Sequence, residues 1–416
     1  MNDAPRLATI PRGFAAAREN SGAALRRPFA HCEVFSDLAQ ARAPWAEIEK
    51  LALASPYQSY GFVDAWLRTT GRARAVEPMI VVARDETGRA NAVLPLGRLR
   101  LGPVCAAEFL GGADANFKMG LFRPGLAASS QAIVELLRRA ARMTTPRVDF
   151  FWLTDQPLSW QGAVNPMATL PRRPSPSFGH KTALNQDFDV WLKSHYSREA
   201  QRKLRKKTRR LHEIGPIAHA VARDEASARE ILAAFLGQKA ARMRALGLAN
   251  AYESPQTARF FEVAATENLA QGTPTIELHA LRSGDRIVAA FGGLAQADRF
   301  CGMFLSHDAD AEISRCSPGQ LMVLETIRDL TARGFATFDL GVGEARYKDE
   351  NCEADEPLFD AAVAVTAVGR FFAATALLER RIKRWTKQTP WAHALAERLR
   401  RRAFLLQSGR RRAERF

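Results

Sequence analysis

A loop-to-helix transition in the second half of the chain has the composition of an anion-binding site. Its residues run Arg315-Cys316-Ser317-Pro318-Gly319-Gln320 and are followed by an apolar stretch. Serine is a good N-cap residue, proline suits the first helical turn, and glycine leaves the backbone unobstructed. A helix that begins this way presents unpaired N–H groups and its positive dipole end to an anion, and Arg315 adds a full charge. The segment predicts a pyrophosphate site; a simple Ser-Pro helix cap is the alternative.

The next predicted strand ends in residues that could move a proton. This strand covers Phe335 to Leu340, so Asp339 lies where the chain leaves the sheet, and Glu344, Tyr347 and Lys348 follow it. Strand ends are where α/β sheets build sites. Asp339 or Glu344 could therefore accept a proton from an attacking amine or hydroxyl, and Tyr347 or Lys348 could bind an anionic group or deliver a proton. The alternatives are that Asp339 caps a turn and that Lys348 is a solvated charge.

Other chemistries leave little trace in the sequence. The eight histidines are dispersed, and neither a Gly-x-Ser-x-Gly elbow nor a Gly-Lys-Ser/Thr phosphate loop occurs. The five cysteines are widely spaced and never arranged as Cys-x-x-Cys, which indicates reduced thiols and no zinc ribbon. The most apolar stretch, Ala361 to Leu378, is interrupted by Gly369 and Arg370. We expect no metal, no spanning helix and a cytoplasmic location.

The formal charge of +16 is concentrated in two segments. Arg198 to Arg210 carries eight basic residues against Glu199, and Arg370 to Phe416 carries fourteen against three acidic ones, which leaves a net charge of −2 for everything else. The first segment is predicted to be a helix, either simply solvated or facing an anionic polymer, a tRNA or acidic lipid. The second alternates aromatic residues with arginines, which favours a peripheral position at the inner membrane face; packing of these aromatics in the core is the alternative.

A repeated supersecondary unit predicts two fused domains of mixed α/β structure. The hairpin around Val82 and Val93 resembles the one around Leu281 and Val288, and each is followed by a strand, a Gly- and Asp-rich loop, a long helix and a closing strand. The Pro- and Arg-rich stretch 166–176 is predicted as the linker between them. The predicted divisions are a basic leader at 1–30, domains at 31–175 and 176–370, and a basic helical tail at 371–416.

Several short motifs, in this order and spacing, resemble a known family. They are Pro56-Tyr57-Gln58-Ser59, Trp66, Phe109-Leu110-Gly111-Gly112, Arg198 with Arg202-Lys203-Leu204-Arg205-Lys206, Ser317-Pro318-Gly319, Phe338-Asp339-Leu340-Gly341 and Tyr347-Lys348. Together they span about residues 32 to 370. The chain resembles GNAT-superfamily acyltransferases of the CelD/BcsL type of cellulose biosynthesis, which are relatives of the FemAB-like transferases.

The resemblance implies tandem duplicated GNAT domains and an acyl-CoA co-substrate such as acetyl-CoA, with no metal. Its pyrophosphate would lie at the helix that begins near Ser317, and the acyl carbonyl would lie against a splayed strand that includes Phe304 and Leu305. The implied reaction is acyl transfer to an amine or hydroxyl acceptor, small, lipid-linked or polysaccharide, in cell-envelope or exopolysaccharide biosynthesis. The alternatives are an aminoacyl-tRNA-dependent transferase of the FemAB-like kind and a catalytically inactive accessory protein of a polysaccharide synthase.

Overall fold

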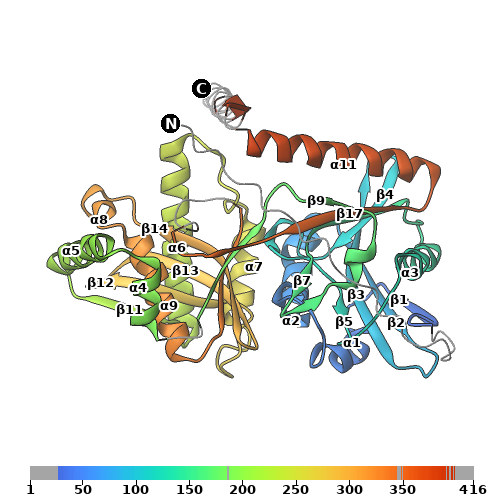
Figure 1. The fold of residues 1–416 in the computed structure, drawn as a ribbon, viewed down its shortest axis with the longest axis horizontal. Helices are drawn as coiled ribbons and strands as arrows, with labels where there is room; N and C mark the ends of the chain where they lie inside the picture. The colour runs from blue at the N-terminus through green and yellow to red at the C-terminus, as the bar shows by residue number, and fades with distance from the viewer. Residues whose placement is uncertain are drawn as a thin grey trace.

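The computed structural model describes residues 27–184, 187–343, 348, 350–389, 391–392, 395–396 and 398, which form two mixed β-sheets with helices packed on them (Figure 1). The predicted leader therefore lies almost entirely outside the described residues, and so does most of the second predicted tail helix.

The first sheet is built mainly from the N-terminal half of the chain. Its strands, in spatial order, are β1 (His31–Phe35), β2 (Glu77–Arg84), β3 (Ala90–Leu101), β4 (Val104–Phe109), β6 (Phe150–Pro157), β17 (Leu358–Ala364) and β9 (Arg172–Pro174). Neighbours are antiparallel except β4 and β6, which are parallel. The predicted hairpin is confirmed, with Val82 opposite Val93. The helices α1 (Arg42–Glu49) and α2 (Tyr60–Trp66) follow β1, and α3 (Ser130–Arg142) connects β4 to β6.

The second sheet repeats this plan. Its strands, in spatial order, are β11 (Ile217–Val221), β12 (Glu277–Ser283), β13 (Arg286–Gln296), β14 (Arg299–His307), β15 (Thr337–Val342), β10 (Gly179–Ala183) and β16 (Ala354–Glu356). Again one neighbouring pair, here β14 and β15, is parallel and the others are antiparallel. Two helices, α6 (Glu225–Leu246) and α7 (Pro255–Thr266), follow β11, and α9 (Pro318–Ala332) connects β14 to β15. Strand order and strand direction thus match between the two halves, as the repeated hairpin predicts.

The two sheets exchange strands. β10 follows the first unit in sequence but pairs with β15 of the second sheet, while β17 follows the second unit but pairs with β6 and β9 of the first. Figure 1 shows β17 running from the second unit across to the first. The predicted linker is not a simple connection, because it contains a 3-10 turn at Pro166–Thr169 and the edge strand β9. The predicted boundary at residue 175 therefore divides the sequence but not the sheets.

The units also share one hydrophobic core. Phe62 of α2 and Phe260 of α7 are both fully buried, and their ring centroids lie 5.3 Å apart, edge to face. Phe260 and Phe261 are neighbours in the same cluster, which continues to Phe304 on β14. Aromatic pairs of this kind bury large apolar areas on both sides of the junction. The relative position of the units is therefore fixed by core packing as well as by strand exchange.

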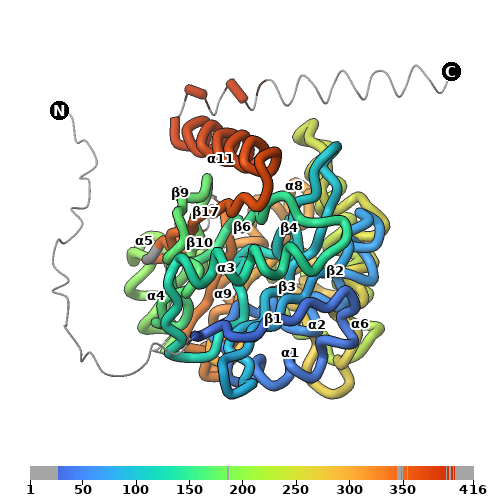
Figure 2. Tube along the Cα trace, turned by 90° about the vertical axis from the view of Figure 1, so that its right-hand side faces the viewer, coloured from blue at the N-terminus to red at the C-terminus, as the bar shows by residue number. Residues whose placement is uncertain are grey.

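Three further helices follow or flank the second sheet: α4 (Phe188–His195), α5 (Arg198–Ile214) and the short α8 (Ala311–Arg315). The predicted basic helix corresponds to α5, which buries Leu204 and Leu211 and exposes most of its cations. The last long helix, α11 (Ala367–Gln388), lies along the outside of the first unit in both views (Figures 1 and 2). Among the described residues, no helix combines the length and apolar character needed to cross a bilayer.

Candidate functional site

A cavity of about 530 Å³ lies where α6, β14 and the start of α9 meet. It is lined by six of the residues predicted from the sequence, namely Phe304, Leu305, Ser317, Pro318, Gly319 and Gln320. The seventh, Arg315, lines a separate cavity of about 420 Å³ with Arg210 and Glu213 of α5. The structure thus brings the predicted strand and helix-start residues together at one surface, and Arg315 lies outside the cavity.

The start of α9 leaves its first backbone N–H available. Pro318 at the first helical position has no N–H, and the N–H groups of Gln320 and Leu321 donate to the Ser317 carbonyl oxygen at 3.0 and 3.2 Å. The first free donor of the helix therefore belongs to Gly319. A side chain at this position would also be tight, because a Cβ on Gly319 would lie 3.3 Å from Cδ2 of His307.

The expectation that the Ser317 side chain caps this helix is wrong. Ser317 occupies the N-cap position, but its φ is +53° and its hydroxyl makes no capping hydrogen bond. An N-cap side chain reaches the N–H groups of the first turn from an extended backbone. In the left-handed conformation the hydroxyl is turned away from that turn, so the helix start depends on the Ser317 carbonyl instead.

Two cations and a histidine face the same cavity. Lys239 and Arg242 lie one turn apart on α6, and Arg242 Nη1 lies 2.5 Å from Nε2 of His307 on β14. His307 Nδ1 lies 3.0 Å from the Asp308 carbonyl oxygen, so Nδ1 carries the proton and Nε2 accepts from Arg242. Burial, and next the positive charge of Arg242, lower the pKa of Lys239 to about 8. Positive charge and a free N–H at one cavity suit an anion.

These basic residues were not predicted from the sequence. Lys239 and Arg242 belong to a 22-residue helix with charges on several sides, and nothing local distinguishes them from its other basic residues. Their spacing of one turn is the signal that could have found them. The contact with His307 spans 65 positions of sequence, so it becomes visible only in the folded chain.

The parallel strands β14 and β15 part beside this cavity. They pair from Arg299 to Cys301 on one strand and from Thr337 to Asp339 on the other, and no further. Asn116, from the first unit, donates from Nδ2 to the Gly302 carbonyl oxygen at 3.2 Å and to the Tyr57 hydroxyl at 3.0 Å. A side chain of the first unit therefore lies in the gap between two strands of the second, while β14 from Met303 onward borders the cavity.

Asp339 is fully buried in an ion cluster. Its Oδ2 contacts Arg299, its Oδ1 accepts from the Gly341 N–H at 2.5 Å, and Arg299 Nη2 also reaches Glu356 at 2.5 Å. Arg299 stacks on the ring of Trp160 from the first unit, 3.8 Å from its centroid. Burial raises the pKa of Asp339, and Arg299 opposes that rise.

Both Asp339 oxygens therefore have partners, and neither faces the cavity that holds the helix start. The geometry assigns Asp339 a structural part in joining the strands, and its part in proton transfer stays a prediction.

The other predicted proton-transfer residues follow β15. Lys348 is buried and donates from Nζ to the carbonyl oxygens of Gly341 at 3.3 Å and Val342 at 3.0 Å, so it holds the chain at the end of the strand. The alternative that Lys348 is a solvated charge is therefore wrong. Glu344 and Tyr347 lie outside the described residues, and their roles stay predictions.

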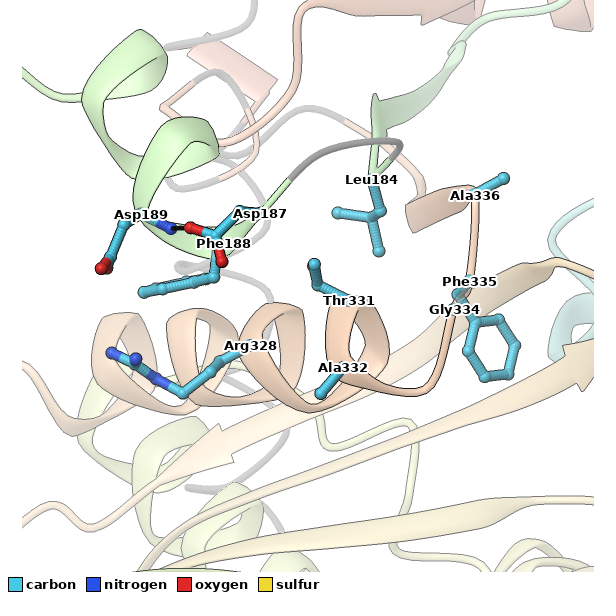
Figure 3. Close-up of a pocket in the computed structure, with 10 residues that line it drawn as sticks. All are labelled: Leu184, Asp187, Phe188, Asp189, Arg328, Thr331, Ala332, Gly334, Phe335 and Ala336. Carbon is cyan, nitrogen blue, oxygen red and sulfur yellow. Dashed lines mark hydrogen bonds between the residues drawn. The ribbon is translucent and has the colours of Figure 1, made fainter.

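A larger cavity, of about 650 Å³, lies at the opposite end of α9. Figure 3 shows Leu184 and Phe188 facing Thr331 and Arg328 of the helix. The Arg328 guanidinium carbon lies 4.0 Å from the centroid of the Phe188 ring. Asp187 accepts from the Asp189 N–H and so caps α4. The polar side chains of this cavity therefore cap a helix or stack on an aromatic ring. None of the predicted site residues lines the cavity.

One cluster has the donor types of a metal site. Side-chain atoms of Glu277, His279 and Asp329 lie within 4.8 Å of one another. Arg333 donates to both carboxylates, at 2.7 and 2.9 Å to Glu277 and 3.0 Å to Asp329. Because a guanidinium already neutralises these oxygens, the set fits an ion pair better than a cation site.

Comparisons with known proteins agree with this architecture. Residues 198–349 match a family model described as an acetyltransferase (GNAT) domain. The second unit is similar to this domain and has the GNAT fold. Because the first unit has the same strand order and directions, the chain has a tandem GNAT fold of mixed α/β class. No curated protein matches the sequence.

Among solved structures, FemX aligns with a TM-score of 0.51 and 10% identity over 79% of this chain and 97% of its own. A conserved protein of unknown function from Bacteroides thetaiotaomicron aligns with a TM-score of 0.50 and 10% identity, over 80% of this chain and 100% of its own. At this identity the likeness concerns the fold of the whole two-unit chain.

Proposed function

We propose that the protein transfers an acyl group from acyl-CoA to an amine or hydroxyl acceptor. The observation that supports this most is the cavity at the start of α9, where the free Gly319 N–H and the cations Lys239 and Arg242 face one space beside β14. The pyrophosphate would bind at this helix start, since an exposed first-turn N–H and nearby positive charges stabilise phosphate oxygens.

The reaction itself would depend mainly on positioning. With its phosphates at α9, the thioester of acyl-CoA would extend along β14 past Leu305 and Phe304, where the strand no longer pairs with β15. Backbone N–H groups at such an open edge would stabilise the oxyanion that forms when the acceptor attacks the carbonyl carbon. The thiolate of CoA would leave, and the acceptor would lose one proton. Glu344, which follows β15 in the sequence, is the proposed acceptor of that proton, and Tyr347 is proposed to deliver a proton to the CoA thiolate.

Acyl-CoA binding is tested by titration calorimetry with acetyl-CoA on the wild type and on Gly319→Val. The branched side chain would cover the first free N–H and press on His307, so we expect affinity to fall at least about tenfold, a loss of about 1.4 kcal/mol. Gly237→Val on α6 is the matched control, because nothing lies within 4 Å of a Cβ there. Absence of binding by the wild type, or equal affinity of both variants, would remove this proposal.

The acceptor is proposed to be a sugar or lipid-linked precursor of cell-envelope polysaccharide, of the cellulose type. This step rests on the resemblance to the CelD/BcsL type of acyltransferase. Release of free CoA thiol in the presence of amino sugars and neutral sugars would separate N- from O-acylation. Release that no sugar stimulates, from a protein that binds acetyl-CoA, would reject the acceptor class and leave the donor proposal standing.

The exposed cations of α5 favour a second candidate, an aminoacyl-tRNA-dependent transferase. Lys203 and Lys207 line a cavity of about 450 Å³ that also includes Gln320, and Lys207 Nζ donates to Gln320 Oε1 at 3.3 Å. The basic face of α5 therefore borders the proposed donor site.

Filter binding of tRNA tests this candidate at several salt concentrations. Reversing the exposed pair with Arg205→Glu and Arg209→Glu is expected to weaken binding and to lower the salt slope by about 0.7 to 0.9 for each phosphate that the variant no longer neutralises. The control reverses Arg72 and Arg223, which are exposed on other elements. If the wild type retains no tRNA at low salt, this candidate is discarded. If the chain binds neither acetyl-CoA nor tRNA, the hypothesis of a catalytically inactive accessory protein is favoured.

A further inference from the structure

The helix α11 attaches to the first unit through its charged side. Arg380 pairs with Asp155 and, at 2.6 Å, with the buried Asp360 of β17, and Arg384 Nη1 donates to the Ser175 carbonyl oxygen at 2.5 Å. Near its start the helix approaches so closely that a Cβ on Gly369 would lie 1.9 Å from the carbonyl oxygen of Asp149. Ion pairs and a small residue thus fix this face, together with the buried Ala373 and the half-buried Phe372, which pack against a core cluster of the first unit.

The opposite side of α11 is apolar and exposed. Phe371, Leu378, Ile382 and Trp385 form one stripe at helical spacing, and their exposed fractions are 66%, 55%, 55% and 52%. Trp391 extends the stripe and meets Trp385 edge to face, with ring centroids 5.5 Å apart. We call these five residues the α11 apolar face.

This helix differs from the usual surface helix because it also carries an apolar stripe that faces water. A surface helix of a globular protein turns its apolar stripe toward the core and its charges toward water. Of the large hydrophobic residues that are exposed in the described part of the chain, half lie between Val368 and Leu395, and so do all the exposed aromatic ones. A patch of this kind marks an interaction surface.

Positive charge borders the α11 apolar face. Arg370, Arg381 and Lys383 are exposed beside it, and Glu379 is the single acidic residue of α11. From residue 370 to the end, the sequence carries fourteen basic and three acidic residues. A second copy of the chain would bring the same cations against this face, and like charges in contact disfavour such pairing.

We propose that the α11 apolar face lies on an anionic lipid surface, with the helix parallel to the membrane plane. Amphipathic helices that bind this way combine aromatic and aliphatic residues on one side with lysine and arginine around them. The apolar side chains enter the headgroup boundary, and the flanking cations contact anionic lipid. Because the charged side of α11 is held by the first unit, the protein body remains in water while its apolar side stays available. This proposal is independent of the acyltransferase chemistry.

Co-sedimentation of the full chain with vesicles tests this proposal. We expect the wild type to sediment with vesicles of phosphatidylcholine and phosphatidylglycerol in equal parts, less with phosphatidylcholine alone, and less at high salt. The triple variant Phe371→Ser, Ile382→Ser and Trp385→Ser should lose at least about tenfold in partition coefficient, since three large apolar groups no longer enter the interface. The substituted positions are exposed, so thermal unfolding should stay near that of the wild type.

The matched control removes exposed apolar residues elsewhere, with Leu51→Ser, Leu101→Ser and Val164→Ser. This variant should sediment like the wild type. A wild type that ignores anionic vesicles, or a triple variant that binds them equally well, overturns the proposal. Light scattering that shows a dimer in the wild type and a monomer in the α11 variant, without vesicle binding, also overturns it in favour of a second copy. Acetyl-CoA affinity, measured on the same samples, reports separately on the proposed function.

Discussion

Lys239 gives the proposed donor site a specific pH dependence. Burial and Arg242 lower the pKa of Lys239 from an ordinary 10.5 to about 8, so the side chain loses its charge as the pH rises through about 8. The neighbouring Tyr252 has its pKa raised by burial and therefore stays neutral over this range. If phosphate binds well only to the charged lysine, affinity for acetyl-CoA should be present below pH 8 and lost above it.

The magnitude follows from the charged fraction. With a pKa of about 8, that fraction falls from roughly nine-tenths at pH 7 to roughly one-tenth at pH 9, so affinity should fall about tenfold. Calorimetric titration with acetyl-CoA at pH 7 and pH 9 measures this ratio directly. Lys239→Met should bind more weakly at pH 7 and show little change between the two pH values. Lys193→Met on α4, an exposed lysine, is the matched control and should keep the wild-type slope.

Lys239 also affects the stability of the fold, which should increase with pH while the affinity for acetyl-CoA decreases. Between about pH 8 and 10.5 the unfolded chain binds a proton at Lys239 that the folded chain does not, so this group makes the fold more stable as pH rises through that window. Lys239→Met removes the cost of burying the charge and should raise Tm at pH 7. A wild-type affinity that is flat from pH 7 to pH 9, or a Lys239→Met variant with the wild-type slope, would show that this lysine does not bind the phosphates.

Three further predictions concern the scaffold around the site. Arg299→Met leaves the buried Asp339 without its cation and should cost about 3 to 5 kcal/mol in urea unfolding; a loss below about 1 kcal/mol would contradict a structural role for the ion cluster. Ser317→Ala should change stability by less than about 0.5 kcal/mol, whereas Ser254→Ala, whose hydroxyl does cap α7, should cost about 1 kcal/mol; equal losses would contradict the assigned cap geometry. Gly341→Ala requires a φ of +76° and would place Cβ 2.6 Å from the Asn116 amide nitrogen, so it should destabilise by about 2 kcal/mol, and an unchanged Tm would count against this close approach.

Local signals in the sequence predicted several elements of the fold. The hairpin of β2 and β3, the helix α9 and the strand β15 each follow from apolar periodicity bounded by turn residues. The predicted helix start also identified four residues of one cavity, Ser317 to Gln320, because helix capping motifs are read over a few adjacent positions.

Strand exchange could not be predicted in this way. Nothing in the residues of β17 themselves says that this strand pairs with β6, about 200 positions earlier in the chain. Pairing partners are chosen by the assembled core and not by the strand's own residues. The sequence-based domain boundary at residue 175 therefore could not show that the first sheet contains β17 from the other side of that boundary.

The environment of Asp339 shows the same limit at the level of one side chain. Its position beside the predicted strand end at Leu340 suggested a proton acceptor, but β15 continues to Val342, so Asp339 lies within the strand. Its partner Arg299 lies 40 positions away, and the stacking of Arg299 on Trp160 involves the other unit. Burial and ion pairing depend on the tertiary structure. The residue type and its local position therefore could not distinguish a proton acceptor from a structural ion-pair partner.

A crystal structure of the protein grown with acetyl-CoA would show directly whether the start of α9 binds the acyl donor. We expect the pyrophosphate within hydrogen-bonding distance of the Gly319 N–H and near Lys239 and Arg242, with the thioester along β14. Density for acetyl-CoA at another surface, or an empty cavity at millimolar ligand with these residues unchanged, would contradict the proposed donor site.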